Sequence, residues 1–256
     1  MHVPLLARLA PWLLFPLFVL AALALYYLTP PFPQPTDFHA YADARAVFGI
    51  PNFADVISNL AILVPAVAGL GLVMATPGGF GNVIERGFAL LFFMALVATG
   101  LGSTWYHLAP DDARLIGDRL PIALAFTTLI AWLLAERTWL RPGAAAMLLP
   151  WIALGPASVL WWYFEGGDLR FYLLLYVFAF VVPPQLMTLP SPYSRRRAWW
   201  LAYVCFVFGM ICDRLDHQIF GWLAGTVSGH TLKHVLMGLA IAQIVSMIER
   251  RRLRFR

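Results

Sequence analysis

Charged residues are scarce in this sequence. Aspartate, glutamate, lysine and arginine make up 12% of its 256 residues, whereas 61% of the residues are hydrophobic. Soluble domains carry about a quarter charged residues, so the composition excludes an ordinary soluble domain and predicts an integral membrane protein. The longest segment that is not apolar runs only from about residue 29 to 52, which leaves no room for a separate soluble domain.

Cysteine and lysine are scarcer still. The two cysteines, Cys205 and Cys212, lie seven residues apart in one expected helix. A helix rises 1.5 Å per residue, so they are separated by about 10 Å, which is too far for a disulfide. We expect both to be small buried apolar side chains. Lys233 is the only lysine, and this bias toward arginine is typical of a GC-rich bacterial genome.

Long apolar runs are abundant, and crossing a bilayer takes about 20 residues. The pattern predicts an all-α integral membrane fold: a seven-transmembrane helix bundle core with one additional N-terminal transmembrane helix. The first run could instead be a signal peptide, but it is long for one and has no clear cleavage site. We therefore expect an N-terminal helix and proline-rich connector at 1–35, a core at 36–248 and a basic cytoplasmic tail at 249–256. The apolar segments cover about 10–28, 53–74, 87–107, 119–136, 145–163, 171–188, 199–216 and 229–248.

The formal charge of +5 is spread over short loops and the C-terminal tail, a distribution that argues against a nucleic-acid partner. Eight spans place both ends of the chain on one side, and basic residues gather on the cytoplasmic side of membrane proteins. We therefore predict cytoplasmic termini in a bacterial inner membrane. The terminal side would hold Arg8, Arg86, Arg137, Arg141, Arg195, Arg196, Arg197, Arg250, Arg251, Arg252, Arg254 and Arg256, whereas the other would hold Arg45, Arg114, Arg119, Arg170 and Arg214.

Three histidines lie in segments that otherwise look like membrane helices. His230 and His234 are four residues apart, so they share one helical face, and His107 follows Ser103 by one turn on another segment. Polar groups inside a bilayer are costly and usually functional. The predicted topology brings these histidines, with Ser103 and Asp118, toward the non-cytoplasmic face.

Three histidines are a typical ligand set for catalytic zinc, because a water molecule takes the fourth position. Zinc lowers the pKa of that water to about 7. Asp118 could then move a proton from the water to a leaving amine, and Ser103 could hydrogen-bond the oxyanion of a substrate carbonyl. The pattern therefore predicts metal-assisted hydrolysis of an amide or ester in a lipid substrate.

Each of these residues also has a purely structural interpretation. Asp118 could form an interfacial ion pair with its neighbour Arg119. Ser103 could bond to a carbonyl of its own helix, as serines in membrane helices often do. The remaining histidines are expected to be interfacial side chains: His2, His39 and His217.

Five motifs together resemble the alkaline ceramidases, within the wider superfamily of seven-helix membrane hydrolases and adiponectin-receptor-like proteins. The likeness extends over about residues 50–248, and the Ser-x3-His-x10-Asp spacing combined with His-x3-His is specific as a set. The motifs are Ser58-Asn59-Leu60, Ser103-Thr-Trp-Tyr-His107, Gly117-Asp-Arg-Leu-Pro121, Arg214-Leu-Asp-His-Gln-Ile-Phe220 and Gly229-His-Thr-Leu-Lys-His234.

The resemblance implies that His107, His230 and His234 bind zinc, that Ser103 supports the oxyanion and that Asp118 handles protons. It also implies the substrate, ceramide, whose amide is cleaved to a sphingoid base and a fatty acid.

The chain departs from the family at an acid-rich calcium site near the first core helix. Asn52 occupies the position of a glutamate ligand, and only Asp37, Asp43 and Asp55 lie nearby. These departures disfavour a calcium site.

Asp213 and Asp216 could orient a ligand histidine or could pair with Arg214 and Lys233. For Asp213 we favour the structural role, which leaves Asp216 as the candidate for orienting a ligand.

The leading hypothesis is thus a zinc-dependent hydrolase that cleaves the amide of ceramide or another N-acyl lipid. One alternative is a non-catalytic receptor or scaffold on the same fold, which would need neither Ser103 nor Asp118. Another is a proton-coupled transporter, although transporters often contain internal repeats and none is visible between the two halves of this chain.

Overall fold

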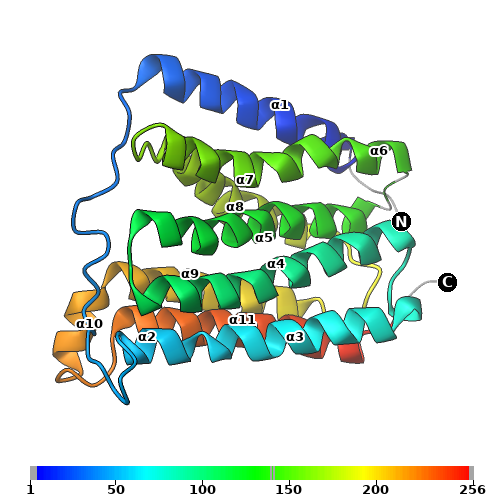
Figure 1. The fold of residues 1–256 in the computed structure, drawn as a ribbon. Coiled ribbons are helices and arrows are strands. Elements are labelled where there is room, and N and C mark those ends of the chain that lie inside the picture. Colours follow the sequence, from blue (N-terminus) through cyan, green and yellow to red (C-terminus); the bar gives the residue numbers. More distant parts are fainter. Residues whose placement is uncertain (1–4, 139, 141, 254–256) are drawn as a thin grey trace.

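The computed structural model describes residues 5–138, 140 and 142–253, and this part of the chain is helical, with isolated β-bridges but no strands. His2, Arg141, Arg254 and Arg256, which entered the sequence predictions, lie outside the described residues. The helices, shown in Figure 1, are α1 (Leu5–Leu28), α2 (Phe53–Ser58), α3 (Leu60–Ala75), η1 (Pro77–Gly79), α4 (Val83–Leu108), α5 (Asp112–Thr138), α6 (Pro142–Ala146), α7 (Leu148–Phe164), α8 (Arg170–Thr188), α9 (Arg197–Arg214), α10 (Asp216–Trp222) and α11 (Gly229–Arg250).

The fold is an all-α membrane bundle, as predicted. Within the described residues, seven helices are long and apolar enough to cross a membrane. The pair α9 and α10 is bent by 83° and supplies an eighth crossing if it is counted as one span. The chain is therefore a multi-pass membrane protein, and its helices fall where the sequence placed the eight apolar segments.

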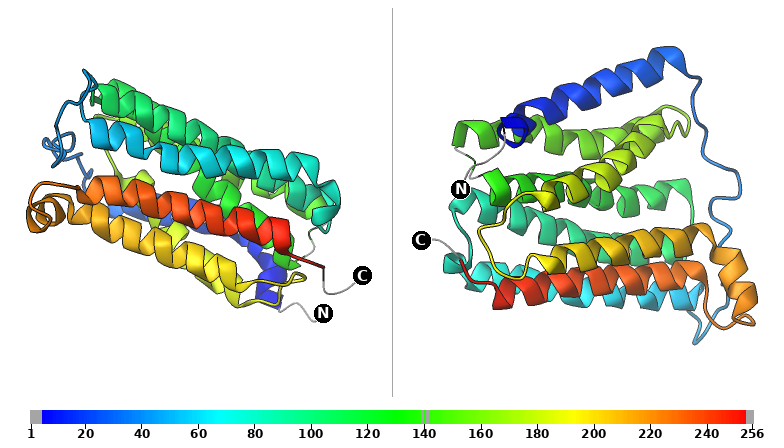
Figure 2. Two further views of the ribbon diagram at one scale, coloured as in Figure 1. Left: turned by 90° about the horizontal axis from the view of Figure 1, so that it is seen from below. Right: turned by 180° about the vertical axis from the view of Figure 1, so that it is seen from behind.

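Helices α3, α4, α5, α8, α9 and α11 form the central part of the bundle, while α7 and α1 pack outside it (Figures 1 and 2). The start of α1 and the end of α11 lie at one end, which we call the terminal end. The connector between α1 and α2 runs across the opposite end, beside α10 (Figure 2). We call this the α10 end.

Small residues allow the central helices to approach closely, as is common between membrane helices. A side chain at Gly102 of α4 would collide with the carbonyl of Gly117 in α5. At the start of α11, a side chain at Gly229 would collide with the carbonyl of Cys212 in α9. These two contacts lie near the α10 end and draw α4, α5, α9 and α11 together there.

The N-terminal helix is tied to the core through one buried ion pair. Arg170 at the start of α8 pairs with Asp168 at 2.8 Å and also donates to the carbonyl of Thr29, 2.8 Å away, just beyond α1. Phe32 in the connector donates its backbone N–H to the same carboxylate. Although burial opposes the effect, hydrogen bonds from Arg170 and Trp161 lower the pKa of Asp168.

The terminal end is closed by a buried ionic cluster. Arg251 lies 3.0 Å from Glu85 of α4 and 3.3 Å from Glu136 of α5, and its guanidinium lies over the ring of Tyr193. Burial raises the pKa of the Tyr193 hydroxyl, which donates to Glu85 at 2.6 Å. The sequence prediction treated these charges as part of loops and a tail. Arg251 is instead 8% exposed and holds the chain after α11 against two other helices.

We expect Gly102→Ala to destabilise the protein by about 1–3 kcal/mol, because the added methyl group overlaps the Gly117 carbonyl and overpacking strains the helix pair. Gly71→Ala is the matched control, since nothing lies within 4 Å of a side chain there and both glycines are helical. Thermal unfolding in detergent measures the difference. Equal midpoints for the two variants would contradict the close α4–α5 contact.

Candidate metal centre

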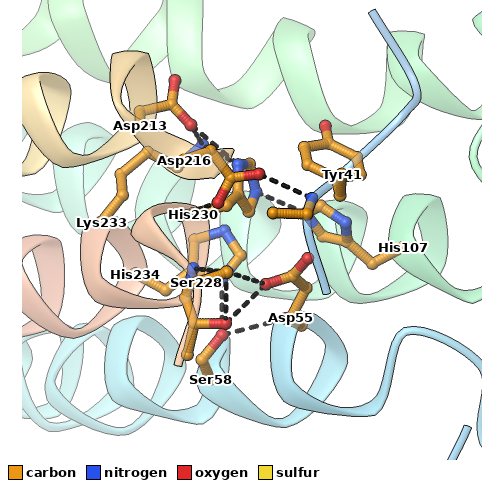
Figure 3. Close-up of polar contacts among 12 residues, drawn as sticks. Tyr41, Asp55, Ser58, His107, Asp213, Asp216, Ser228, His230, Lys233 and His234 are labelled. Carbon is orange, nitrogen blue, oxygen red and sulfur yellow. Dashed lines mark hydrogen bonds and ion pairs between the residues drawn. The ribbon is translucent and has the colours of Figure 1, made fainter. Parts of the chain in front are cut away.

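Three buried histidines converge at the α10 end of the bundle (Figure 3). His107 comes from the last turn of α4, and His230 and His234 come from the first two turns of α11. One ring nitrogen from each lies within 4.8 Å of the others, and all three side chains are buried. The predicted histidine set therefore forms one group that could hold a metal ion.

Partners on the outer side of two rings fix which nitrogen faces the centre. Asp213 of α9 lies 2.7 Å from Nδ1 of His230 and can only accept, so that nitrogen donates. The hydroxyl of Ser58 donates to the Asp55 carbonyl, so it accepts from Nδ1 of His234 at 2.7 Å. The Nε2 atoms of both rings are therefore left to bind a metal. Hydrogen bonds of this kind orient metal-binding histidines in general.

The spacing of the nitrogens fits a tetrahedral ion. Nε2 of His230 lies 3.0 Å from Nε2 of His107. Two imidazole ligands on a tetrahedral zinc ion would be about 3.3 Å apart, given zinc–nitrogen bonds of about 2.0–2.1 Å. A cation also removes the conflict between two lone pairs that face each other in a buried place. The set supplies three neutral nitrogen ligands and leaves a fourth position for another ligand.

Asp213 has two roles near α10. It pairs with Lys233 at 3.0 Å, the structural role that we favoured, and it also accepts from Nδ1 of His230. Asp216, our candidate for orienting a ligand, accepts the backbone N–H groups of His230, at 2.7 Å, and Ala42, at 2.8 Å, and makes no ring contact in the described part of the chain. The bend between α9 and α10 turns Asp216 toward the backbone at the start of α11.

A second buried carboxylate anchors α11 to the first core helix. Asp55 is completely buried and accepts a hydrogen bond from the Thr231 hydroxyl at 2.7 Å. Ser228, the residue that caps α11, accepts the backbone N–H of Thr231 at 3.0 Å. Asp55 and Ser58 therefore hold the helix that carries two of the three histidines. The sequence analysis named Asp55 and Ser58 only within the family comparison, and it assigned them no such role.

The connector covers the histidines at the α10 end. The ring of Tyr41 packs against His107 and His230, with ring centroids 4.9 Å and 4.3 Å apart. Its hydroxyl donates to Tyr106 at 3.0 Å. Burial, together with the neighbouring Tyr106, raises the pKa of Tyr41, so this hydroxyl remains a donor. No sequence pattern marked Tyr41, because it lies in an irregular segment.

Further contacts hold the connector in place. Nδ1 of His39 lies 2.8 Å from the Tyr106 hydroxyl and its other nitrogen lies 3.2 Å from Asp112. His217 donates to the carbonyl of Ala40 at 3.0 Å. We expected both histidines to be simple interfacial side chains, but both fasten the connector.

Two of the acidic residues considered for calcium, Asp43 and Asp55, have other partners. The guanidinium of Arg45 binds Asp43 at 2.6 Å, and this hydrogen bond lowers the pKa of the Asp43 carboxyl. The amide of Asn52 donates to the backbone carbonyl of His107 at 2.9 Å. Asn52 thus supports the helix end that carries a histidine.

A cavity of about 190 Å³ extends from His234 into the bundle. Its polar end is lined by Ser103, Asp118, Asp213, Lys233 and His234. The rest is apolar and reaches residues such as Leu133, Met187, Trp199 and Ile244. At 1.5 Å per residue, the lining positions extend about 15–22 Å along α4, α5 and α11.

Ser103 and Asp118 both line this cavity, next to the histidines. The threonines beside Ser103, Thr99 and Thr104, bond to carbonyls one turn back, whereas Ser103 faces the cavity. Oδ1 of Asp118 is buried and has no hydrogen-bond partner within the described part of the chain.

The alternative ion pair between Asp118 and Arg119 does not form. The Arg119 guanidinium lies instead over aromatic rings, at 4.7 Å from Phe38, 4.2 Å from Trp162 and 5.1 Å from Tyr172. Asp118 is therefore left facing the cavity.

No protein-family model matches this chain, and no curated protein matches it. The function must therefore be argued from the residues of the site.

We expect about one zinc ion per chain in protein purified from zinc-replete cells, measured by elemental analysis. The double variant His230→Ala/His234→Ala removes two of three ligands and should reduce the zinc content to background. A folded wild-type preparation without bound metal would contradict a metal centre.

We expect Ser58→Ala and Asp213→Asn each to weaken zinc binding by about 10- to 100-fold, because each loses a partner that orients a ligand ring. Competition with a zinc chelator measures this affinity. Ser158→Ala is a control, since this buried serine bonds only within α7, to the carbonyl of Gly155. Unchanged affinity in both site variants would mean that packing alone orients the rings.

Proposed function

We propose that this protein is a zinc-dependent intramembrane amidohydrolase that cleaves the amide bond of ceramide or a related N-acyl lipid. The products would be a free amine and a fatty acid. One observation carries the proposal: the three-histidine centre borders, through His234, the polar end of a long apolar cavity that is also lined by Ser103 and by Asp118, whose Oδ1 has no hydrogen-bond partner in the described part of the chain.

The bound ion would be held by His107, His230 and His234. Zinc in such a site lowers the pKa of a water ligand to about 7 and polarises a carbonyl group. Asp118 accepts the proton of the attacking water and delivers it to the nitrogen of the leaving amine. Ser103 donates a hydrogen bond to the carbonyl oxygen as negative charge develops there.

The cavity supports a lipid substrate. The whole cavity, its polar end included, is about 15–22 Å long by helix rise, and one leaflet of the hydrocarbon core is about 15 Å thick. An acyl chain of ordinary length therefore fits with its carbonyl near the histidines. Tyr41 and the connector shield the same centre at the α10 end, which restricts the entry of water.

The resemblance to alkaline ceramidases, which rests on the same residues, also supports the proposal. The motif residues Ser103, His107, Asp118, His230 and His234 are separated by up to 131 positions, yet they lie around one centre. The name of the substrate, ceramide, depends on this resemblance alone. Another N-acyl lipid satisfies the same chemistry.

The closed terminal end of the bundle favours an enzyme over a transporter. A transported ion or solute needs access to both faces of the membrane. Here the terminal end is closed by Arg251, Glu85, Glu136 and Tyr193, which bond to one another. A pure scaffold, in turn, has no need of a buried carboxylate that faces a cavity, as Asp118 does.

We also propose that both termini face the cytoplasm of a bacterial inner membrane, with the metal centre toward the opposite side. Exposed basic residues at the terminal end, such as Arg195 and Arg252, support this orientation.

We expect Asp118→Asn to keep its zinc but to lose hydrolysis by about 10²- to 10⁴-fold, because proton transfer by a positioned side chain contributes that much. Release of fatty acid from a panel of N-acyl lipids, ceramide included, measures activity, and elemental analysis measures zinc. Asp37→Asn, on the exposed connector, is the control for the loss of one carboxylate. Full activity of Asp118→Asn would show that another group moves the proton.

A further inference from the structure

Lys233 lies on the cavity-facing side of the helix that carries two of the histidines. It follows His230 by three residues, so these two side chains are neighbours on the helix surface. Its side chain lines the polar end of the cavity, together with Ser103 and Asp118. A lysine is expensive to place at this depth in a membrane protein and needs a reason.

The ammonium group has more hydrogen-bond donors than partners. It lies 3.0 Å from Oδ1 of Asp213, and the same oxygen already accepts from Nδ1 of His230. Nδ1 of His230 lies 3.2 Å from the ammonium group but cannot accept a hydrogen bond from it. This nitrogen carries the proton that it donates to Asp213, so it has no free lone pair. An ammonium group carries three donors. At least one N–H donor is therefore left for an acceptor in the cavity.

Lys233 is the cation among the charged side chains that line the cavity, and the other two are Asp118 and Asp213. The carboxylates of Asp55 and Asp216 also lie beside the histidine-bearing helix, but they accept hydrogen bonds from Thr231 and from the backbone N–H groups of His230 and Ala42. A carboxylate of a ligand in the cavity therefore has Lys233 as a charged hydrogen-bond donor.

We propose that Lys233 binds the head group of the substrate and selects N-acyl lipids whose amine part carries a carboxylate, as in an N-acyl amino acid. This inference rests on the proposed function. In such a lipid the carboxylate is joined to the amide nitrogen through one carbon atom. The ammonium of Lys233 is separated from the metal-facing nitrogen of His230 by a single imidazole ring, so one substrate molecule can reach both.

The first experiment compares two substrates with the same hexadecanoyl chain: N-acylglycine, which has a carboxylate, and N-acylethanolamine, which is neutral. Zinc-loaded wild-type protein should hydrolyse the acidic lipid with a kcat/KM about 10- to 100-fold higher, the range expected for a charged hydrogen bond. Lys233→Met should lose this preference, so that the ratio of its two kcat/KM values falls toward one. Lys233→Arg keeps the charge and should keep most of the preference.

Arg250→Met removes one positive charge from an exposed position at the terminal end and is the matched control. Elemental analysis of each variant checks that zinc is retained. Equal kcat/KM values for the two lipids in wild-type protein would overturn the inference and leave the proposed function standing. Loss of zinc from Lys233→Met would also overturn it, because Lys233 would then act only by holding Asp213.

The second experiment measures binding without turnover. It uses ketone analogues in which a methylene group replaces the amide nitrogen, one ending in a carboxylate and one in a hydroxyl group. Wild-type protein should bind the carboxylate analogue about 10- to 100-fold more tightly, and Lys233→Met should bind both equally. Preferential binding in protein that hydrolyses no N-acyl lipid would support the role of Lys233 and refute the proposed hydrolase. Equal binding of the two analogues by wild-type protein would refute the role of Lys233.

Discussion

Three imidazole rings buried at one depth of an apolar bundle impose the strictest constraint on this structure. Each ring carries two nitrogens, and a nitrogen without a partner is costly away from water. Asp213 and Ser58 satisfy the outer nitrogens of His230 and His234, whereas Nδ1 of His107 has no hydrogen-bond partner in the described part of the chain. The inner nitrogens then face one another, where a cation can bind them all. Because Ser58 lies on α2 and Asp213 on α9, these two contacts fix the positions of α2 and α9 relative to α11.

The close helix contacts and the connector serve the same centre. Gly102 lets α4 touch α5, which brings Ser103 beside Asp118, and Gly229 lets α11 touch α9, which brings His230 onto Asp213. Tyr41 then covers two of the rings from outside the bundle. The close helix contacts, the hydrogen bonds to the histidines and the cover provided by Tyr41 are therefore all located at the α10 end. The terminal end carries a separate ionic cluster.

The position of the candidate metal centre relates its proposed chemistry to its proposed substrate. The centre borders, through His234, an apolar cavity whose polar end holds Ser103, Asp118 and Lys233. Under the proposed function, a lipid would place its apolar chain in this cavity and its polar group beside these three residues. Lys233 would then supply a charged hydrogen-bond donor to the head group.

The sequence by itself determined the eight apolar segments and the histidine set, because membrane helices and an i,i+4 pair are local patterns. Tertiary structure alone decided which residues support that set. Tyr41 comes from a connector without periodicity, Ser58 reaches His234 across 176 positions, and Asp213 replaces Asp216 because the chain bends between α9 and α10. It also decided that Arg251 is buried in an ionic cluster. Such partners are set by helix packing, whose contacts join residues far apart in the chain and leave no local signature.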